Sequence, residues 1–383
     1  MPPPFRAVAR VSSLTDFGGV YLHIPFCRKK CAYCDFYSAF ATEELLDRYV
    51  AALIREIEKR GDSYGRPVDS VYFGGGTPSL LGERIEPVLS AVRRHFDLLP
   101  DTEITAEANP SSADLPFLQA ARRAGVNRLS LGIQSGRDAD LQRLGRTHTA
   151  KEAEETFFAS RDLGYDNISV DLMAALPDSS PETLAESLDF VRNLDPEHIS
   201  VYLLKIEPNT KFFQLADTLN LPDEDEQAEQ YLQICAFLEQ NGYRHYEISN
   251  FAKAGYESRH NLKYWRGAEY LGIGPAAHSF VGGRRFYYPR DLKRFCECPE
   301  TVADGFGGDF AETVLLRLRL AGGIDFSKTA RRFGVALPQD FQKRLDRFAE
   351  AGFGDFSGNS FYLTDRGMLV SNQIIGELLE DLS

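Results

Sequence analysis

Residues 20–34 read VYLHIPFCRKKCAYC and place a strand signal and a cysteine cluster in direct succession. The first five residues are mainly apolar or aromatic, which predicts a short buried strand. Three cysteines, Cys27, Cys31 and Cys34, then follow within eight residues. Loops at the carboxyl ends of strands carry the chemistry of α/β barrels. The stretch therefore predicts an α/β protein with clustered thiols above its first strand.

Short strand-like runs alternate with amphipathic helical segments through the first half of the chain. The runs cover residues 20–24, 70–73, 103–106, 128–133, 167–172 and 198–204. The clearest helix is predicted over residues 43–59, with Thr42 as its N-cap. Strands that alternate with helices predict a parallel sheet. Six such units are fewer than the eight of a closed barrel, so we predict a partial, six-stranded TIM-like barrel.

The pattern changes after residue 241, and a different organisation is expected from there on. Residues 243–285 are rich in glycine, tyrosine and histidine and lack a clear period. Helices are predicted over residues 312–320 and 339–351, with a hairpin at residues 353–363 and a last helix from Asp365. This order suggests a winged-helix-like region that packs rather than binds DNA. The predicted divisions are an N-terminal lead (1–19), the barrel (20–241), a middle region (242–309) and a helical C-terminal domain (310–383).

Composition and charge exclude several classes of protein. The chain has 383 residues and a formal net charge of −13, so it repels nucleic-acid backbones and no nucleic-acid partner is expected. No apolar run approaches the ~18–20 residues that span a bilayer. Residues 1–19 lack the apolar core of a signal peptide. We therefore expect a cytoplasmic protein whose six cysteines serve a metal or catalysis rather than disulfides.

Two kinds of metal centre are compatible with the cysteine cluster. A structural zinc site has four ligands, commonly as two separate pairs, and no fourth cysteine or histidine follows closely here. Cys296 and Cys298 are the remote thiols that could still close such a site. A four-iron cluster held by three cysteines instead leaves one iron open for a substrate or cofactor. We favour the iron–sulfur interpretation, and zinc is the alternative.

Glycines and polar residues recur where the predicted strands end. Residues 74–78 read GGGTP, which suits either close approach to a ligand or a tight strand-to-helix turn. Polar side chains follow four later strands: Glu107, Gln134, Asp171 and Lys205. One strand-end carboxylate is usually a helix cap. Because four consecutive strand ends carry polar groups above a cysteine loop, we predict a single site there.

At this point the chain resembles a known superfamily. The CxxxCxxC loop, with Tyr33 before its last cysteine, and the GGGTP motif are similar to those of radical S-adenosylmethionine (SAM) proteins. Residues 21–27 (YLHIPFC), 127–134 (NRLSLGIQ) and 171–177 (DLMAALP) narrow the resemblance to the oxygen-independent coproporphyrinogen III oxidase group. The resemblance extends from Val20 to the C-terminus.

Within that group the chain is more similar to the haem-chaperone branch, HemW, than to the oxidase branch, HemN. The oxidase carries a further cysteine where this chain has Phe36, and it has a longer segment before the first strand. The chaperone branch has a His-Asn-x-x-Tyr-Trp motif, matched here by residues 260–265. One departure is Ala174-Ala175, where the group usually has Tyr-Gly.

The resemblance implies roles for individual residues. Cys27, Cys31 and Cys34 would bind a [4Fe-4S] cluster, and its free iron would bind SAM. Residues that would contact or flank this SAM are Tyr21, Tyr33, Gly75 and Glu107. Residues that would line a second SAM or a substrate are Gly76, Thr77, Gln134, Arg146, Asp171 and Lys205.

Haem would be the cargo, and His260 is the first candidate for its axial ligand because imidazole is a common donor to haem iron. Tyr264 and Trp265 would form its walls, although they could equally be core residues. His245 and His278 are alternative ligands.

The sequence thus predicts a haem chaperone that delivers haem to accepting proteins. Its expected partners include an electron donor such as flavodoxin or ferredoxin, and peripheral membrane contact during delivery. The alternative is an enzyme, a coproporphyrinogen III dehydrogenase-type oxidoreductase. A radical SAM enzyme that modifies tRNA is disfavoured by the acidic charge.

Overall fold

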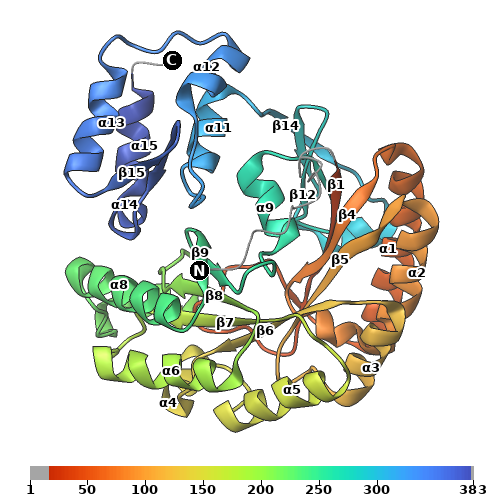
Figure 1. Cartoon of the computed structure of the whole chain (residues 1–383). Coiled ribbons are helices and arrows are strands. Elements are labelled where there is room, and N and C mark those ends of the chain that lie inside the picture. Colours follow the sequence, from red (N-terminus) through yellow and green to blue (C-terminus); the bar gives the residue numbers. More distant parts are fainter. Residues whose placement is uncertain (1–16, 381–383) are drawn as a thin grey trace, which may run out of the picture.

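The computed structural model describes residues 17–380, so the expected N-terminal lead over residues 1–19 lies almost wholly outside the described part (Figure 1). Six parallel strands lie side by side in chain order and form the centre of the fold. They are β1 (Gly18–Ile24), β4 (Val68–Gly75), β5 (Leu98–Ala108), β6 (Arg128–Gln134), β7 (Ile168–Ala174) and β8 (His198–Leu203). All six strand-like runs in the sequence therefore form strands, and they pair as a parallel sheet.

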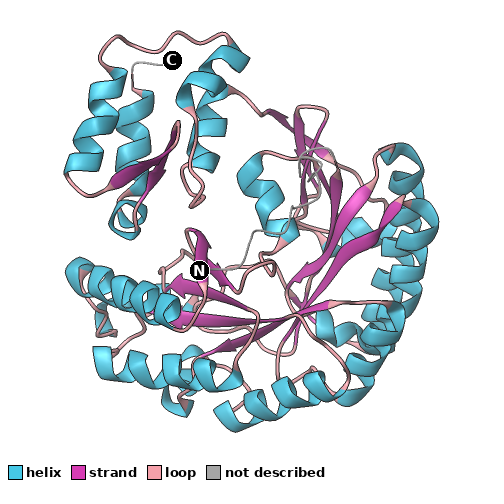
Figure 2. Cartoon of the chain, viewed as in Figure 1, coloured by secondary structure: helices cyan, strands magenta, loops and turns pink. Residues whose placement is uncertain are grey.

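The sheet continues beyond these six strands at both edges, which corrects the expected strand count. Next to β1 come β11 (Tyr270–Ile273), parallel to it, and then the antiparallel strands β12 (His278–Val281), β13 (Arg284–Tyr287) and β14 (Val302–Phe306). Beyond β8 lie β10 (Asn250–Ala252) and β9 (Arg244–Glu247), both antiparallel to their neighbours. Figure 2 shows these edge strands as short arrows. Strands of three to five residues are too short to give a readable hydrophobic period.

Helices cover the outer side of the curved sheet (Figure 1). They are α1 (Glu43–Tyr64), α2 (Ile85–His95), α3 (Leu115–Ala124), α4 (Asp138–Leu144), α5 (Ala150–Asp162), α6 (Pro181–Leu194) and α8 (Glu224–Gln240). Thr42 caps α1 as predicted, because its hydroxyl accepts a hydrogen bond from the Leu45 amide. The helix runs past the predicted end at residue 59 and stops at Gly65, whose φ of 64° suits glycine. Short elements near the strand ends are β2 (Phe26–Cys27), β3 (Ala39–Phe40), a 3₁₀ helix (Pro78–Arg84), α7 (Lys211–Gln214) and a second 3₁₀ helix (Ala216–Thr218).

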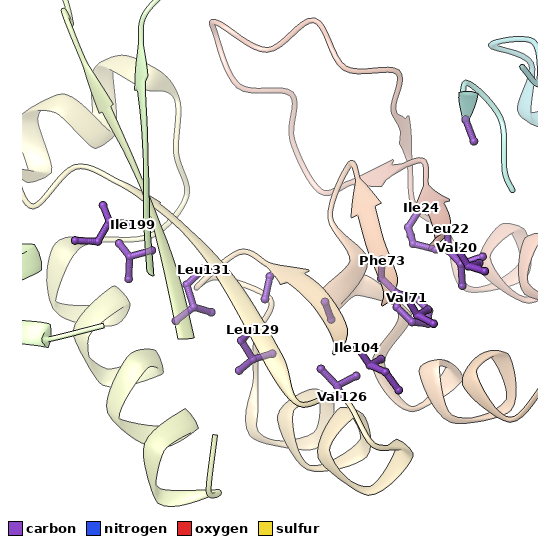
Figure 3. Packing of buried hydrophobic residues seen from close by; sticks show 14 of the residues in the cluster. Val20, Leu22, Ile24, Val71, Phe73, Ile104, Val126, Leu129, Leu131 and Ile199 are labelled. Atoms are coloured by element: carbon purple, nitrogen blue, oxygen red, sulfur yellow. The ribbon is translucent and has the colours of Figure 1, made fainter. Parts of the chain in front are cut away.

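The two faces of the sheet differ sharply in polarity. Successive side chains of a strand point to opposite faces, so one alternating set meets the helices. Figure 3 shows apolar residues of this set, among them Val20, Leu22, Val71 and Leu129, gathered in the core. The other set is polar although it is buried: His23, Ser70, Thr105, Arg128, Ser130, Ser169, His198 and Ser200. The interior of the curved sheet is therefore lined by polar side chains rather than by an apolar core.

The middle and C-terminal regions supply the remaining helices. The middle region contains α9 (Arg259–Arg266) and α10 (Leu292–Glu297). The C-terminal region contains α11 (Phe310–Arg317), α12 (Phe326–Phe333), α13 (Phe341–Glu350), the hairpin β15 (Gly354–Ser357) and β16 (Ser360–Leu363), α14 (Asp365–Leu369) and α15 (Ser371–Leu379). Helix α12 was not predicted. Among residues 17–380, no helix combines the length and the apolar character needed to cross a bilayer.

Candidate functional site

The cysteine loop lies above the carboxyl end of β1 and is fastened to two distant segments. The amide of Ala32 donates to the Leu144 carbonyl at the end of α4 (2.9 Å), and the Ala32 carbonyl accepts from the Phe212 amide of α7 (2.9 Å). Cys27, Cys31 and Cys34 are free, half-buried thiols in this loop. Because its backbone is held on both sides, the loop presents all three thiols to one cavity.

Two neighbours approach these thiols directly. The Cys27 sulfur lies 3.5 Å from the hydroxyl of Thr77, and a guanidinium nitrogen of Arg146 donates to the Cys31 sulfur at 3.7 Å. The thiolate is the form of cysteine that binds a metal. The Arg146 guanidinium also donates to the Gly132 carbonyl, and its Nε has no partner among the described residues. Arg146 thus links the cysteine loop to the end of β6.

The glycine loop allows the end of β4 to pack tightly against the cysteine loop. A Cβ at Gly76 would lie 2.6 Å from the Phe26 carbonyl oxygen, and the Gly76 amide donates to the Ile24 carbonyl at 2.8 Å. Gly75 has a φ of 112°, and a Cβ there would lie 2.6 Å from the imidazole of His23. The sequence left two explanations for these glycines, close approach to a ligand or a tight turn, and the packing of the chain against Gly75 and Gly76 accounts for them without a ligand.

Glu107 and Asp171 are two carboxyl groups on the polar face of the sheet. Glu107 accepts hydrogen bonds from the Tyr72 hydroxyl (2.9 Å) and the Gly75 amide (3.2 Å), and Asp171 accepts one from Ser130 (3.2 Å). Burial, and then the charge of Asp171, raise the pKa of Glu107 to about 7. Burial also raises the pKa of Asp171 to about 6. A cationic ligand between them would favour the ionised form of both groups.

Twelve of the fourteen residues predicted for the site line one open cavity, which encloses about 1510 Å³ counted to its mouth. They are Cys27, Cys31, Tyr33, Cys34, Gly75, Gly76, Thr77, Glu107, Gln134, Arg146, Asp171 and Lys205. Gln134 has a φ of 76°, unusual for a residue with a side chain. Lys205 is mostly exposed and pairs with Glu207 at 2.9 Å. The part of this space that can hold ligand atoms, about 460 Å³, lies within the ~300–1,000 Å³ of most small-molecule sites.

Tyr21 and His260 are the two predicted site residues that do not line the cavity. Tyr21 bonds to Nδ1 of His23 (3.1 Å), and its ring stacks beside those of Tyr72 and His260, with centroids 6.2 and 6.3 Å away. His260 is only 1% exposed, and its two ring nitrogens bond to Ser70 (3.0 Å) and to the hydroxyl of Tyr264 (2.9 Å). In this structure His260 therefore offers no free nitrogen to haem, contrary to the first expectation.

The other two candidate histidines have different surroundings. His278 is exposed and stacks on Tyr287 at 5.1 Å, so its imidazole is accessible. His245 pairs with Asp365 at 2.8 Å, far along the chain from the cysteine loop. Trp265 packs in a small apolar cluster with Tyr246, Leu262 and Leu320, which is a core role.

Sequence reasoning missed several residues that line the cavity. Phe36, with 60% of its surface exposed, and Tyr202 place aromatic surface in the cavity wall. Ser130, Gly132 and Met173 lie in line with Gln134 and Asp171 on the same face of β6 and β7. Residues two apart on a strand point to the same face, so the alternation of these strands could have predicted that Ser130, Gly132 and Met173 line the cavity.

The donor set suits an iron–sulfur cluster with SAM better than a closed zinc site. Within residues 17–380, the cavity lining contains three thiols and no histidine, so a fourth zinc ligand of the usual type is missing there. Three thiolates with an open fourth position are what a four-iron cluster needs to bind a cofactor. The carboxyl groups of Glu107 and Asp171 suit the ammonium and ribose hydroxyls of SAM.

Comparisons with known proteins agree with this geometry. The family model described as "Radical SAM superfamily" matches residues 21–191, and that described as "HemN C-terminal domain" matches residues 310–370. Heme chaperone HemW of Bacillus subtilis is 36% identical over 377 residues, covering 94% of this chain and 99% of that protein. Heme chaperone HemW of Escherichia coli is 42% identical over 371 residues, covering 93% and 96%.

A solved structure shows that the fold is shared as well. Coproporphyrinogen III oxidase (HemN) from Escherichia coli superposes with a TM-score of 0.81 and covers 95% of this chain and 90% of its own. At 24% identity this likeness shows a common fold alone. By its near full-length identity to the two curated relatives, the chain belongs to the HemW family of radical SAM proteins.

Proposed function

We propose that the protein is a haem chaperone, which binds haem and passes it to haem-dependent proteins. The observation that carries the proposal is the identity of 36% and 42%, over nearly the whole chain, to two proteins named heme chaperone HemW. Phe36 supports it, because the oxidase branch has a further cysteine at that place. The bound cargo would be haem, and the accepting partners would be haem proteins.

We propose that Cys27, Cys31 and Cys34 hold a [4Fe-4S] cluster, which when bound supplies a redox centre with an open iron for SAM. The chain's own residues would position SAM in the cavity. Glu107 would accept hydrogen bonds from the ammonium or ribose of SAM. The residues of a second SAM or substrate site would be Gly76, Thr77, Gln134, Arg146, Asp171 and Lys205, which line the same cavity. Tyr33 would pack beside the cluster. Tyr21 would act through Tyr72 and Glu107 rather than by contact.

Two histidines, His260 and His278, are the candidates for the axial ligand of haem. Use of His260 would require its bonds to Ser70 and Tyr264 to break. His278 can reach haem without any rearrangement, because it is exposed on β12. The test is titration of haem into His278→Ala, His260→Ala and the control His95→Ala. A changed haem spectrum in only one of the first two identifies the axial ligand; unchanged spectra in both exclude the pair.

The competing function is radical decarboxylation of coproporphyrinogen III. An oxidase would consume SAM in step with protoporphyrinogen IX, whereas a chaperone would bind and release haem. The reconstituted protein should therefore bind haem and form no protoporphyrinogen IX when incubated anaerobically with SAM and coproporphyrinogen III. Product formation at a catalytic rate would replace the chaperone function with the oxidase function.

We also propose the finer organisation expected from the sequence. The six parallel strands would act as a partial TIM-like barrel in residues 20–241, followed by the middle region (242–309). The helices and hairpin of residues 310–383 would form a winged-helix-like packing domain.

The six cysteines, all within the described range, form no disulfide, which suits a cytoplasmic location. A flavodoxin or ferredoxin would supply electrons, and membrane contact would be peripheral.

A further inference from the structure

A second cluster of ligand-type side chains lies outside the SAM cavity, where the barrel meets the C-terminal region. Cys235 comes from α8, His245 from β9 and Asp365 from the first turn of α14. The candidate ligand atoms of these three residues all lie within 4.8 Å of one another. They are far apart in the sequence, and the fold brings them together.

The cluster faces an open cavity rather than a closed core. Cys235, His245 and Asp365 line a hollow of about 830 Å³, counted to its mouth, so an ion and water can enter. Cys235 is 4% exposed, and the Asp365 side chain is the most exposed of the three. Glu239 lines the same hollow one helical turn after Cys235, on the same face of α8. A fourth donor, from Glu239 or from water, is therefore at hand.

The imidazole of His245 is held in place by several contacts. Its Nδ1 lies 2.8 Å from Asp365 Oδ1, and its ring stacks on Phe251 at 4.3 Å with an angle of 14° between the planes. Its Nε2 lies 3.4 Å from the Tyr231 hydroxyl, which also donates to the Ile248 carbonyl. A ligand fixed by stacking loses little conformational entropy when it binds an ion.

We propose that Cys235, His245 and Asp365 form a metal site, here named the junction site, that takes a zinc-type divalent ion. Thiolate, imidazole and carboxylate together are the donor set of zinc, whose bonds of ~2.0–2.3 Å place tetrahedral ligand atoms about 3.4 Å apart. The His245–Asp365 pair would open by less than about 1 Å to admit the ion, replacing one hydrogen bond with two metal bonds. Glu239 or water completes the tetrahedron.

The junction site would fasten the C-terminal region to the barrel. Asp365 begins α14, whereas Cys235 and His245 belong to the barrel side. The same junction is otherwise held by main-chain contacts such as the Ile248 amide with the Arg319 carbonyl (3.0 Å). An ion that binds only the folded junction stabilises it by mass action.

The test uses the full chain with Cys27, Cys31 and Cys34 replaced by alanine, so that zinc cannot occupy the cluster site. Titration with Zn²⁺ against a chromophoric chelator should show one zinc per chain and a raised Tm. Adding Cys235→Ala or Asp365→Asn should weaken zinc binding by more than ~10–100-fold, because even residues behind the ligands typically cost that much. Cys296→Ala, which removes another buried thiol, is the matched control and should change nothing.

The absorption of bound cobalt is a second measurement. It reports on the bond between the metal and the Cys235 thiolate, so a purely structural role of Cys235 would not affect it. Co²⁺ in the same background should show a thiolate-to-cobalt absorption that disappears in Cys235→Ala. If the triple variant does not fold, zinc is counted in the reconstituted wild type after exposure and desalting, next to Cys235→Ala. Equal zinc content and affinity with and without Cys235, or no bound zinc in the wild type, would overturn the proposal.

Discussion

Replacing Glu107 with glutamine should make the protein more stable at high pH, because an ionised carboxylate at this buried position destabilises the folded state. Burial and the nearby charge of Asp171 raise the pKa of Glu107 from 4.5 to about 7. Glutamine has the shape of the protonated acid and never ionises; its oxygen can accept from the Gly75 amide while its NH2 group donates to the Tyr72 hydroxyl oxygen.

The sign and the size follow from linkage between protonation and folding. Because the pKa is raised in the folded state, the stability contributed by Glu107 is present below pH 4.5 and is lost as the pH rises through about 7. A pKa of about 7 instead of 4.5 corresponds to about 3 kcal/mol. For 383 residues, at roughly 2 cal/mol/K of unfolding entropy per residue, this is a shift in Tm of about 4 °C.

The assay is thermal unfolding of the cluster-free protein between pH 5 and 8, with wild type and Glu107→Gln side by side. As the pH rises from 5 to 8, the Tm of the variant minus the Tm of the wild type should increase by about 3–4 °C. Glu350→Gln, at an exposed position, is the control and should show no such gain. In the protein reconstituted with its cluster, SAM should narrow the gap at pH 8, since its cationic groups compensate the wild-type carboxylate. A gap that does not depend on pH would refute the assignment of the raised pKa to Glu107.

Three further predictions concern single positions. Cys31→Ala should lose the cluster, measured as a drop from about four irons per chain after anaerobic reconstitution and loss of the broad absorption near roughly 400 nm; an iron content equal to wild type would contradict the ligand assignment. Gly75→Val should reduce both SAM affinity and Tm, because its φ is 112° and its Cβ meets the His23 ring; unchanged values of both would contradict the packing argument. Ala175→Gly should raise the unfolding free energy by about 1 kcal/mol, since Ala175 has a φ of 55°, whereas Ala174→Gly in β7 should lower it.

The Ala174-Ala175 departure noted in the sequence gains a physical meaning from the structure. The related group usually has glycine at the second position, and Ala175 here adopts a left-handed conformation that glycine adopts without cost. Its amide is held by the side chain of Gln230 at 3.0 Å. That bond, from a helix far along the chain, holds the conformation, which is why sequence alone showed only an unusual residue.

The parallel core and the cavity lining were predictable because they follow local rules. Strand-like runs and helical periods set the order of elements, and parallel strands bring their carboxyl ends to one edge. These two rules were sufficient to predict that the polar residues at the ends of β5, β6 and β7 lie close together. The edge strands β9 to β14 escaped it, since each is too short to show a period and pairs with segments far away in sequence.

His260 and Lys263 show where a motif is misleading without tertiary structure. Both lie on α9, which turns them into the polar interior, where Lys263 pairs with Asp69 at 2.5 Å. Burying such groups is costly unless each finds a partner, so the helix position is tightly specified. His260 and Lys263 therefore attach α9 to β4 and β5, through Ser70, Asp69 and Glu103. Arg128, also buried there, acts through its charge: it lowers the pKa of both Glu107 and Asp171 against the effect of burial. Arg128 is thus the buried charge that couples this interior to the two carboxyl groups, and replacing it with methionine should raise the pKa of both.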